Sequence, residues 1–146
     1  MLLFFDIANE PISLTPDLPM SGLWIFLPIG YLVTILIETP IVTAGLPRAF
    51  SLKQRIFSGI WLTACTYPIV VLFLPALMQG MGRSVYLFVA EIFAPAAECI
   101  LFWLAFRGKP LSSARWMWSF AVIAAANVAS FAIGELLSVV GWFGLF

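Results

Sequence analysis

Four glutamates lie inside long apolar stretches of this sequence, where a carboxyl group is unusual. All seven Lys and Arg residues lie between those stretches instead. An ionisable side chain at bilayer depth costs about 2.5 to 3.5 kcal/mol on insertion scales, so it normally persists because it has a function. Carboxyl groups at such positions bind or relay protons and cations. The four are Glu38, Glu91, Glu98 and Glu135.

Glu38 and Glu98 are the pair that we expect to share a site. At the helical rise of about 1.5 Å per residue, each lies about 12 Å from the basic segment that follows it. Glu91 precedes Glu98 by one heptad, about 700° around a helix, so both project from one face. Glu135 lies toward the far end of its own stretch. These positions predict an inner pair and two outer carboxyls that act as a relay.

Neutral polar residues and prolines in the same stretches are expected to complete the site. Thr63, Thr66 and Asn127 would bridge the carboxyls as neutral hydrogen-bonding groups. Pro40 and Pro95 each remove the helical donor from a carbonyl four residues earlier. Carboxylates together with freed carbonyl oxygens suit hard cations. The pattern predicts a bound proton or cation of open identity and no organic cofactor.

Three structural interpretations compete with such a site. In the first, buried glutamates stay protonated and hydrogen-bond neighbouring helices. In the second, a basic side chain at a helix end, Arg48 or Arg107, extends inward and pairs with a glutamate. In the third, the prolines, Pro68 above all, simply kink their helices. Against all three stands the number of intramembrane carboxyls, which exceeds what one structural hydrogen bond requires.

Composition assigns the chain to the integral membrane proteins. Of its 146 residues, 63% are hydrophobic and 10% are charged, and the mean hydropathy is +1.09, far too apolar for a soluble domain. A net charge of zero without a long basic run argues against nucleic acid as a partner. The lack of histidine excludes an imidazole-based triad, haem ligand or zinc site within the chain. Cys65 and Cys99 lack CxxC spacing and are interpreted as buried free thiols.

Four apolar segments are long enough to cross a bilayer as helices. They cover residues 23–46, 56–78, 85–106 and 117–140. Connectors 47–55 and 107–115 carry six of the seven basic residues, so the positive-inside rule places them in the cytoplasm and both termini outside. Residues 1–22 have three prolines and no helical period, which predicts an extended or interfacial segment on the extracytoplasmic side. The remaining unit, 23–146, is the predicted transmembrane domain.

The expected fold is all-α, with four antiparallel transmembrane helices in two hairpins. A weak internal repeat is suggested because residues 63–66 resemble residues 127–130, each pairing an amide or hydroxyl with a hydroxyl three positions later. Ala126, Ser130 and Gly134 form a stripe of small residues, which predicts close packing of another helix against it.

Three functional classes remain after these exclusions. An intramembrane glutamate site that binds or translocates protons or cations explains the carboxyls. An accessory subunit of a larger membrane complex, or a homo-oligomer, explains the small size and the small-residue stripe, with the glutamates protonated and structural. An intramembrane enzyme is disfavoured, because the sequence has no nucleophile and base pair, HExxH, GxSxG or phosphate loop. In each class the lipid bilayer is a partner.

Overall fold

The computed structural model describes residues 20–140, and every regular element in this range is helical. In chain order these are α2 (Met20–Gly45), α3 (Leu52–Pro68), the π-helix η1 (Ile69–Phe73), α4 (Leu74–Leu77), α5 (Arg83–Phe106) and α6 (Ser113–Val140). The all-α class predicted from the sequence is confirmed. Of the predicted segment 1–22, residues 1–19 lie outside the described range, and α2 already begins at Met20.

Four helical stretches are long and apolar enough to cross a bilayer. They are Leu27–Gly45, Leu52–Leu77, Ser84–Phe106 and Ser113–Leu137. The second starts four residues before its predicted segment, because Ser51 and Gln54 form a capping box that begins α3. The Ser51 hydroxyl accepts from the Gln54 N–H, and the Gln54 side chain accepts from the Ser51 N–H. The chain is a multi-pass membrane protein.

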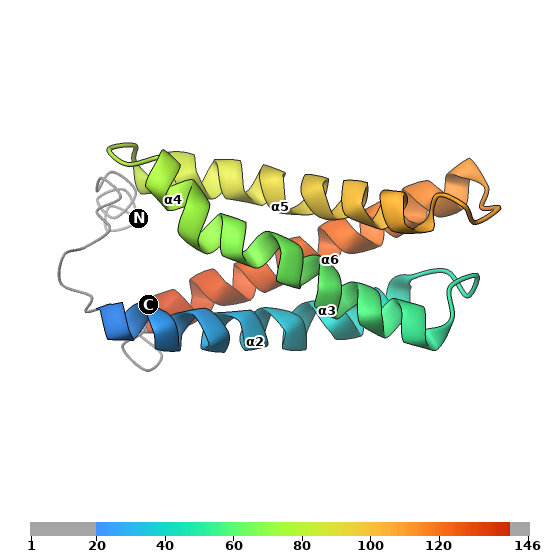
Figure 1. Ribbon diagram of the computed structural model, residues 1–146, viewed down its shortest axis with the longest axis horizontal. Helices are drawn as coiled ribbons and strands as arrows, with labels where there is room; N and C mark the ends of the chain where they lie inside the picture. Colours follow the sequence, from blue (N-terminus) through green and yellow to red (C-terminus); the bar gives the residue numbers. More distant parts are fainter. Residues whose placement is uncertain (1–19, 141–146) are drawn as a thin grey trace.

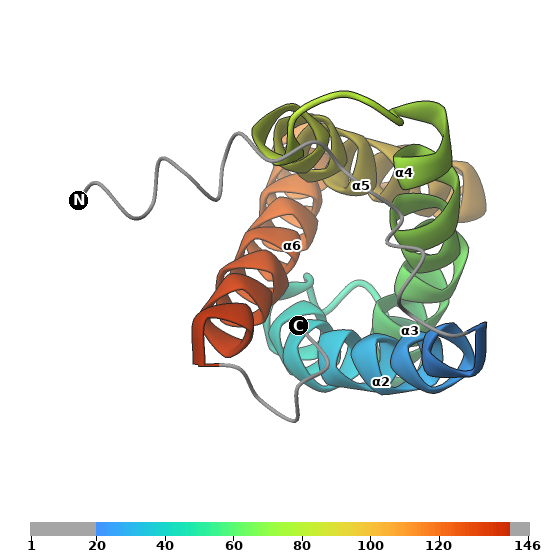
Figure 2. The same ribbon diagram turned by 90° about the vertical axis from the view of Figure 1, so that its left-hand side faces the viewer.

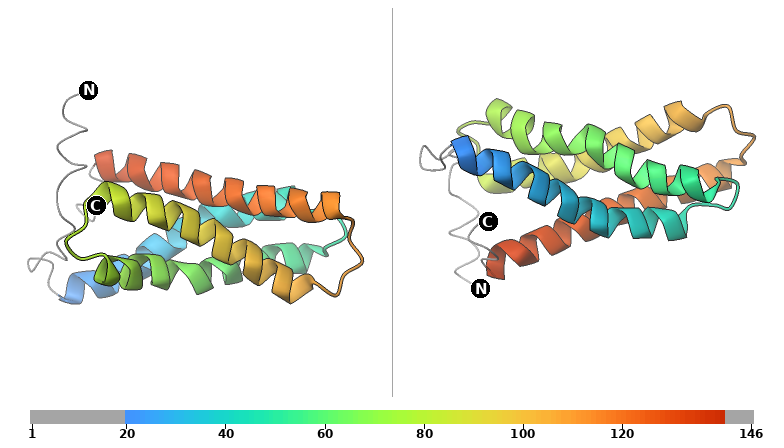
Figure 3. Two further views of the ribbon diagram at one scale, coloured as in Figure 1. Left: turned by 90° about the horizontal axis from the view of Figure 1, so that it is seen from above. Right: turned by 60° about the horizontal axis from the view of Figure 1, so that its bottom comes forward.

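The four long helices form a bundle with a ring-shaped cross-section (Figures 1 and 2). Helix α2 packs against α3 and α6, and α5 packs against the same two helices. Figure 3 shows from two further sides that the helices lie lengthwise beside one another. Connectors 46–51 and 107–112 lie together at one end (Figure 1, right), called the basic end, and connector 78–82 lies at the opposite end.

Aromatic side chains fill the interior near the basic end. We call Phe50, Phe102, Phe106 and Trp116 the aromatic plug. The Phe102 ring centroid lies 5.1 Å from that of Phe50, 4.9 Å from that of Phe106 and 6.1 Å from that of Trp116. Phe50 and Phe102 are fully buried, and aliphatic side chains extend this core toward the middle of the bundle. The aliphatic part comprises Val42, Leu46, Leu62, Ile123 and Ala126.

The second membrane span changes helix type in its middle. Because Pro68 has no N–H, the carbonyl of Ala64 lacks its usual helical donor. The chain continues as the π-helix η1, in which the Leu74 N–H bonds the carbonyl of Ile69, five residues earlier. The sequence predicted a kink at Pro68, and the structure has a π-turn directly after this residue. In contrast, α2 and α5 run as single helices through Pro40 and Pro95.

Gly59 brings α3 into close contact with α2. A Cβ at this position would lie 2.7 Å from the Cα of Thr39, so the two helix backbones approach more closely than any side chain permits. Gly59→Ala is therefore expected to push α2 and α3 apart and to destabilise the bundle by about 1 to 3 kcal/mol. Thermal unfolding in detergent measures this loss.

Gly134→Ala is the matched control, because a Cβ at Gly134 in α6 would meet no neighbour within 4 Å. Replacing a helical glycine by alanine without a clash is neutral or slightly stabilising. Equal stability of the two alanine variants would contradict the close contact at Gly59.

Candidate functional site

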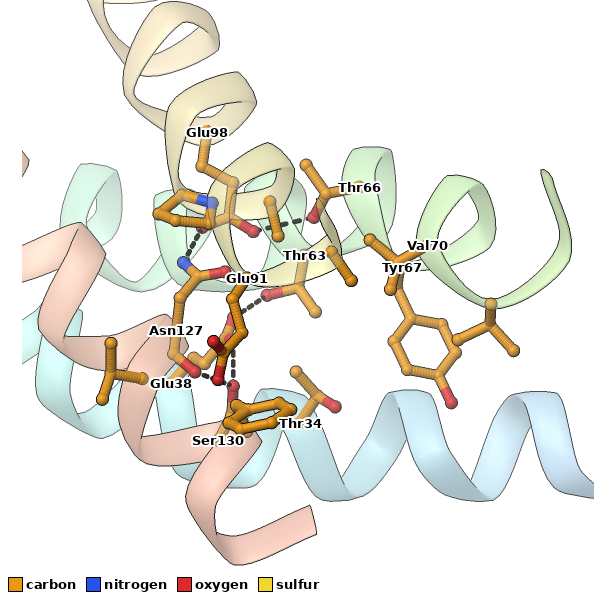
Figure 4. Close-up of a pocket in the computed structure, with 16 residues that line it drawn as sticks. Thr34, Glu38, Thr63, Thr66, Tyr67, Val70, Glu91, Glu98, Asn127 and Ser130 are labelled. Atoms are coloured by element: carbon orange, nitrogen blue, oxygen red, sulfur yellow. Dashed lines mark hydrogen bonds between the residues drawn. The ribbon is translucent and has the colours of Figure 1, made fainter. Parts of the chain in front are cut away.

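All four long helices line one cavity of about 160 Å³ (Figure 4). Its polar lining residues come from α2, α3, α5 and α6. They are Thr34, Glu38, Thr63, Thr66, Tyr67, Glu91, Glu98, Asn127 and Ser130. The cavity extends from Glu38 and Glu98 toward the opposite end, since Thr34, Ala90 and Phe131 lie about one to two turns farther in that direction.

Glu38 on α2 is almost fully buried, with 3% of its surface exposed. The Thr63 hydroxyl on α3 donates to Glu38 Oε2 at 2.6 Å, and the Ser130 hydroxyl on α6 donates to Glu38 Oε1 at 2.6 Å. Both carboxyl oxygens are thus bonded, each to a different helix. The short distances are typical of hydrogen bonds to a charged or strongly polar partner.

Glu98 on α5 is equally buried, with 3% exposure. The Thr66 hydroxyl on α3 donates to Glu98 Oε1 at 2.8 Å, and Asn127 Nδ2 on α6 donates to Glu98 Oε2 at 2.7 Å. The second N–H of Asn127 donates to the carbonyl of Ile123 at 3.1 Å. Asn127 is therefore a fixed donor to Glu98, with both of its N–H groups used.

Six side chains form two hydrogen-bonded groups in the middle of the bundle, one around Glu38 and one around Glu98. Thr63 and Thr66 are three residues apart on α3, as are Asn127 and Ser130 on α6, so each pair lies on one helix face and reaches both glutamates. Figure 4 shows these side chains converging from four helices. We call the set the polar ring: Glu38, Thr63, Thr66, Glu98, Asn127 and Ser130.

Each hydroxyl in the polar ring lies between a carboxyl oxygen and a backbone carbonyl. The Thr63 oxygen is 2.6 Å from Glu38 Oε2 and also 2.8 Å from the carbonyl of Gly59. Thr66 and Ser130 have the same double contact, with backbone carbonyls at 3.1 and 2.9 Å. A hydroxyl carries one proton, so it donates to one of these acceptors at a time.

The outer carboxyls predicted from the sequence occupy different surroundings. Glu91 lines the cavity but is exposed, whereas Glu135 is half-buried and is not among the lining residues. Of the small-residue stripe, Ala126 is fully buried, Ser130 bonds Glu38, and Gly134 faces open space. The structure thus gathers five of the seven predicted site residues into hydrogen-bonded contact and adds Ser130 to them.

Tyr67 and Thr34 line the cavity without having been predicted from the sequence. The Tyr67 hydroxyl occupies the space where a Cβ of Gly30 would lie, so this glycine permits the tyrosine to cross toward α2. No local pattern marks such a pairing between helices, because the two residues are distant in the chain.

The basic side chains lie away from the polar ring. Among the described residues, no Lys or Arg forms an ion pair with Glu38 or Glu98. Arg107 is exposed and lies over the Trp103 ring at 5.9 Å, and Arg55 donates to the carbonyl of Thr43 at 2.8 Å. The interpretation in which Arg48 or Arg107 neutralises an inner glutamate is therefore wrong for these residues, because Arg48 also remains exposed at the basic end.

Neither similarity to known proteins nor a cluster of metal ligands in residues 20–140 identifies a function for this chain. Comparisons with protein-family models, with curated proteins and with solved structures found no match. Within residues 20–140, no group of three or more His, Cys, Asp or Glu side chains lies together as metal ligands would. Cys65 and Cys99 are free and half-buried. The polar ring is therefore the feature from which we infer the function.

Proposed function

We propose that this protein binds and exchanges protons through Glu38 and Glu98, and that this exchange serves proton or cation translocation across the membrane. The observation that carries the proposal is the pairing of two buried carboxyls on one cavity, each bonded by donors from two other helices. No basic partner among the described residues compensates their charge. Such groups in a membrane are typical of proton pathways.

The hydroxyls of Thr63 and Ser130 can hydrogen-bond Glu38 in both its ionised and its protonated form without any movement of non-hydrogen atoms. When Glu38 is ionised, Thr63 and Ser130 both donate to it. When Glu38 takes up a proton, it donates that proton to one hydroxyl, which turns its own proton to the backbone carbonyl beside it. Proton binding then requires the rotation of one hydroxyl and no movement of a helix.

Glu98 works in the same way with one difference. Asn127 donates to Oε2 in either state, so a proton taken up by Glu98 sits on Oε1 and is donated to the Thr66 hydroxyl. A proton fits this arrangement because its uptake needs only the rotation of one hydroxyl, whereas a metal ion such as Ca²⁺ takes about six to eight oxygen ligands around one point. Glu91 is the proposed relay, since it lines the cavity from its exposed side.

The proposal also includes the arrangement of the helices as two related hairpins and their orientation in the membrane. Glu38 bonds Thr63 on the next helix and Ser130 on α6, while Glu98 bonds Asn127 on the next helix and Thr66 on α3. Each glutamate thus bonds one side chain in its own hairpin and one in the other hairpin. This symmetric pattern supports two antiparallel hairpins related by an internal repeat. With the basic end in the cytoplasm, the cavity extends from the carboxyls toward the extracytoplasmic side.

The competing function is that of a subunit in a larger membrane complex, or in a homo-oligomer, with both glutamates permanently protonated. Exposed Glu91 supports it, because this carboxyl lies on α5 between exposed Phe88 and Ile92, where a partner helix would cover it. The polar ring would then serve as interhelical hydrogen bonds alone. The two functions differ in whether the carboxyls change protonation.

Infrared difference spectroscopy of the protein in lipid bilayers tests this point. A step in pH is expected to change the C=O bands of the Glu38 and Glu98 carboxyls in the difference spectrum. These bands should be absent from the double variant that carries both Glu38→Gln and Glu98→Gln. Ser130→Ala should shift the Glu38 band, because it removes one of its two donors. Ser119→Ala on the same helix is the matched control, since its buried hydroxyl bonds only the carbonyl of Arg115. Carboxyl bands that never change with pH would instead support the subunit function.

A further inference from the structure

The cavity is larger and more apolar than proton binding requires. Its volume of about 160 Å³ is close to the roughly 150 Å³ of an engineered apolar cavity that accommodates benzene. Beyond the carboxyls, most of its wall is hydrocarbon. The apolar side chains that form this wall are Val70, Val71, Ala90, Ala94, Pro95, Val128 and Phe131.

The mouth of the cavity lies between α5 and α6. The lining residues Glu91 on α5 and Val128 on α6 are exposed, Val128 to 64%. Figure 2 shows the ends of α5 and α6 that face the viewer well apart from each other. Open space at Gly134, farther along α6, agrees with this separation. Since both helices are membrane spans, the mouth faces the bilayer laterally.

The charges and rings of the lining select for an organic cation. Glu38, Glu91 and Glu98 all line the cavity, and no Lys or Arg is among its lining residues. An inorganic cation prefers oxygen ligands on several sides, whereas in this cavity the two buried carboxyls lie at one end and most of the remaining wall, apart from Thr34, Tyr67 and Glu91, is hydrocarbon. The rings of Tyr67 and Phe131 also line it, and aromatic faces attract ammonium groups.

We propose that the cavity takes up a small organic ammonium ion of about six to ten heavy atoms from the membrane, through the mouth between α5 and α6. This inference rests on the proposed proton exchange at Glu38 and Glu98. The ammonium N–H groups bind the ionised carboxyls, and the displaced carboxyl proton passes to water. The hydrocarbon part of the ligand occupies the apolar wall, and Glu91 is the first carboxyl that the cation meets.

Binding of benzylammonium to the full chain in phosphatidylcholine nanodiscs tests the proposal, with empty nanodiscs to correct for partitioning. Calorimetry is expected to detect binding, and a pH indicator is expected to detect released protons. Benzyl alcohol, which has the ring without the charge, and Na⁺, which has the charge without the ring, should each bind at least about tenfold more weakly. Equal binding of either one would overturn the proposal.

Two variants separate this proposal from the proton site. Val128→Trp fills the mouth and should abolish benzylammonium binding while the carboxyl infrared bands still change with pH. Ile133→Trp, an exposed position on α6 outside the cavity lining, should bind as the unmodified chain does.

The remaining outcomes are also decisive. If the carboxyl infrared bands change with pH but no benzylammonium binds, the proposed ligand is wrong and the proposed proton site is retained. Carboxyls that do not titrate would overturn both. Undiminished binding by Val128→Trp would contradict the lateral mouth.

Discussion

Glu98→Gln is expected to reduce proton flux in liposomes to the rate of empty vesicles while leaving the fold intact. Glutamine resembles a protonated glutamate, because it has one acceptor oxygen and one donor group, an NH₂ in place of the O–H. Its oxygen can accept from Asn127 Nδ2, and its amide can donate to Thr66, whose proton then turns to the carbonyl of Leu62. The polar ring keeps its contacts, but the site can no longer gain or lose a proton.

The measurement combines a pH-sensitive dye inside proteoliposomes with thermal unfolding of the same variant. The free energy of unfolding should change by no more than about 1 kcal/mol, the net contribution of a typical hydrogen bond. Glu38→Gln should behave in the same way. Glu135→Gln is the matched control, since it makes the same change at a glutamate that does not line the cavity, and it should retain most of the flux. Undiminished flux in folded Glu98→Gln protein would contradict the transport function.

The positions of the inner pair could be predicted from the sequence because charge and hydropathy fix depth in a membrane. The basic residues mark one end of the bundle, and counting residues from that end places Glu38 and Glu98 at matching depths. Thr63, Thr66 and Asn127 were predicted as neutral polar residues within the same apolar segments. The structure places all five in the polar ring, in hydrogen-bonded groups around Glu38 and Glu98, with Ser130 as the sixth member.

Rotation and separation of helices could not be predicted in this way. Glu91 and Glu98 share a helix face, yet one is exposed and the other buried, because α6 covers Glu98 and lies away from α5 near Glu91. Ser130 was assigned to helix packing, since its side chain alone does not reveal which neighbour it meets. The π-helix after Pro68 could not be predicted either, since Pro40 and Pro95 lie in uninterrupted helices and a proline alone does not distinguish the two outcomes. The first two features depend on distances between helices, which hydropathy does not encode.

Phe102→Ala is expected to cause the largest loss of stability of any single change in the bundle. Phe102 is fully buried, at 0% exposure, about one turn from Glu98 toward the basic end, and its ring contacts the other three members of the aromatic plug. Truncating a buried phenylalanine costs about 3 to 5 kcal/mol, because the surrounding side chains collapse only partly into the space. Thermal unfolding in detergent should show this loss. Phe88→Ala is the matched control, since Phe88 lies on the same helix with 64% exposure and its loss should cost about 0.5 kcal/mol or less.

The same variant also tests whether the aromatic plug seals the proton site from the basic end. Removing the Phe102 ring leaves room for water between Glu98 and the basic end of the bundle, so proton flux through the variant in liposomes should exceed that of the unmodified protein at temperatures below the unfolding transition of the variant. Combining Phe102→Ala with Glu98→Gln should suppress that additional flux, because the path then lacks its titrating carboxyl. Additional flux that persists in the double variant would show that protons bypass Glu98. A single variant whose proton flux equals that of the unmodified protein would show that another layer, such as Leu62 and Ile123, limits access from the basic end.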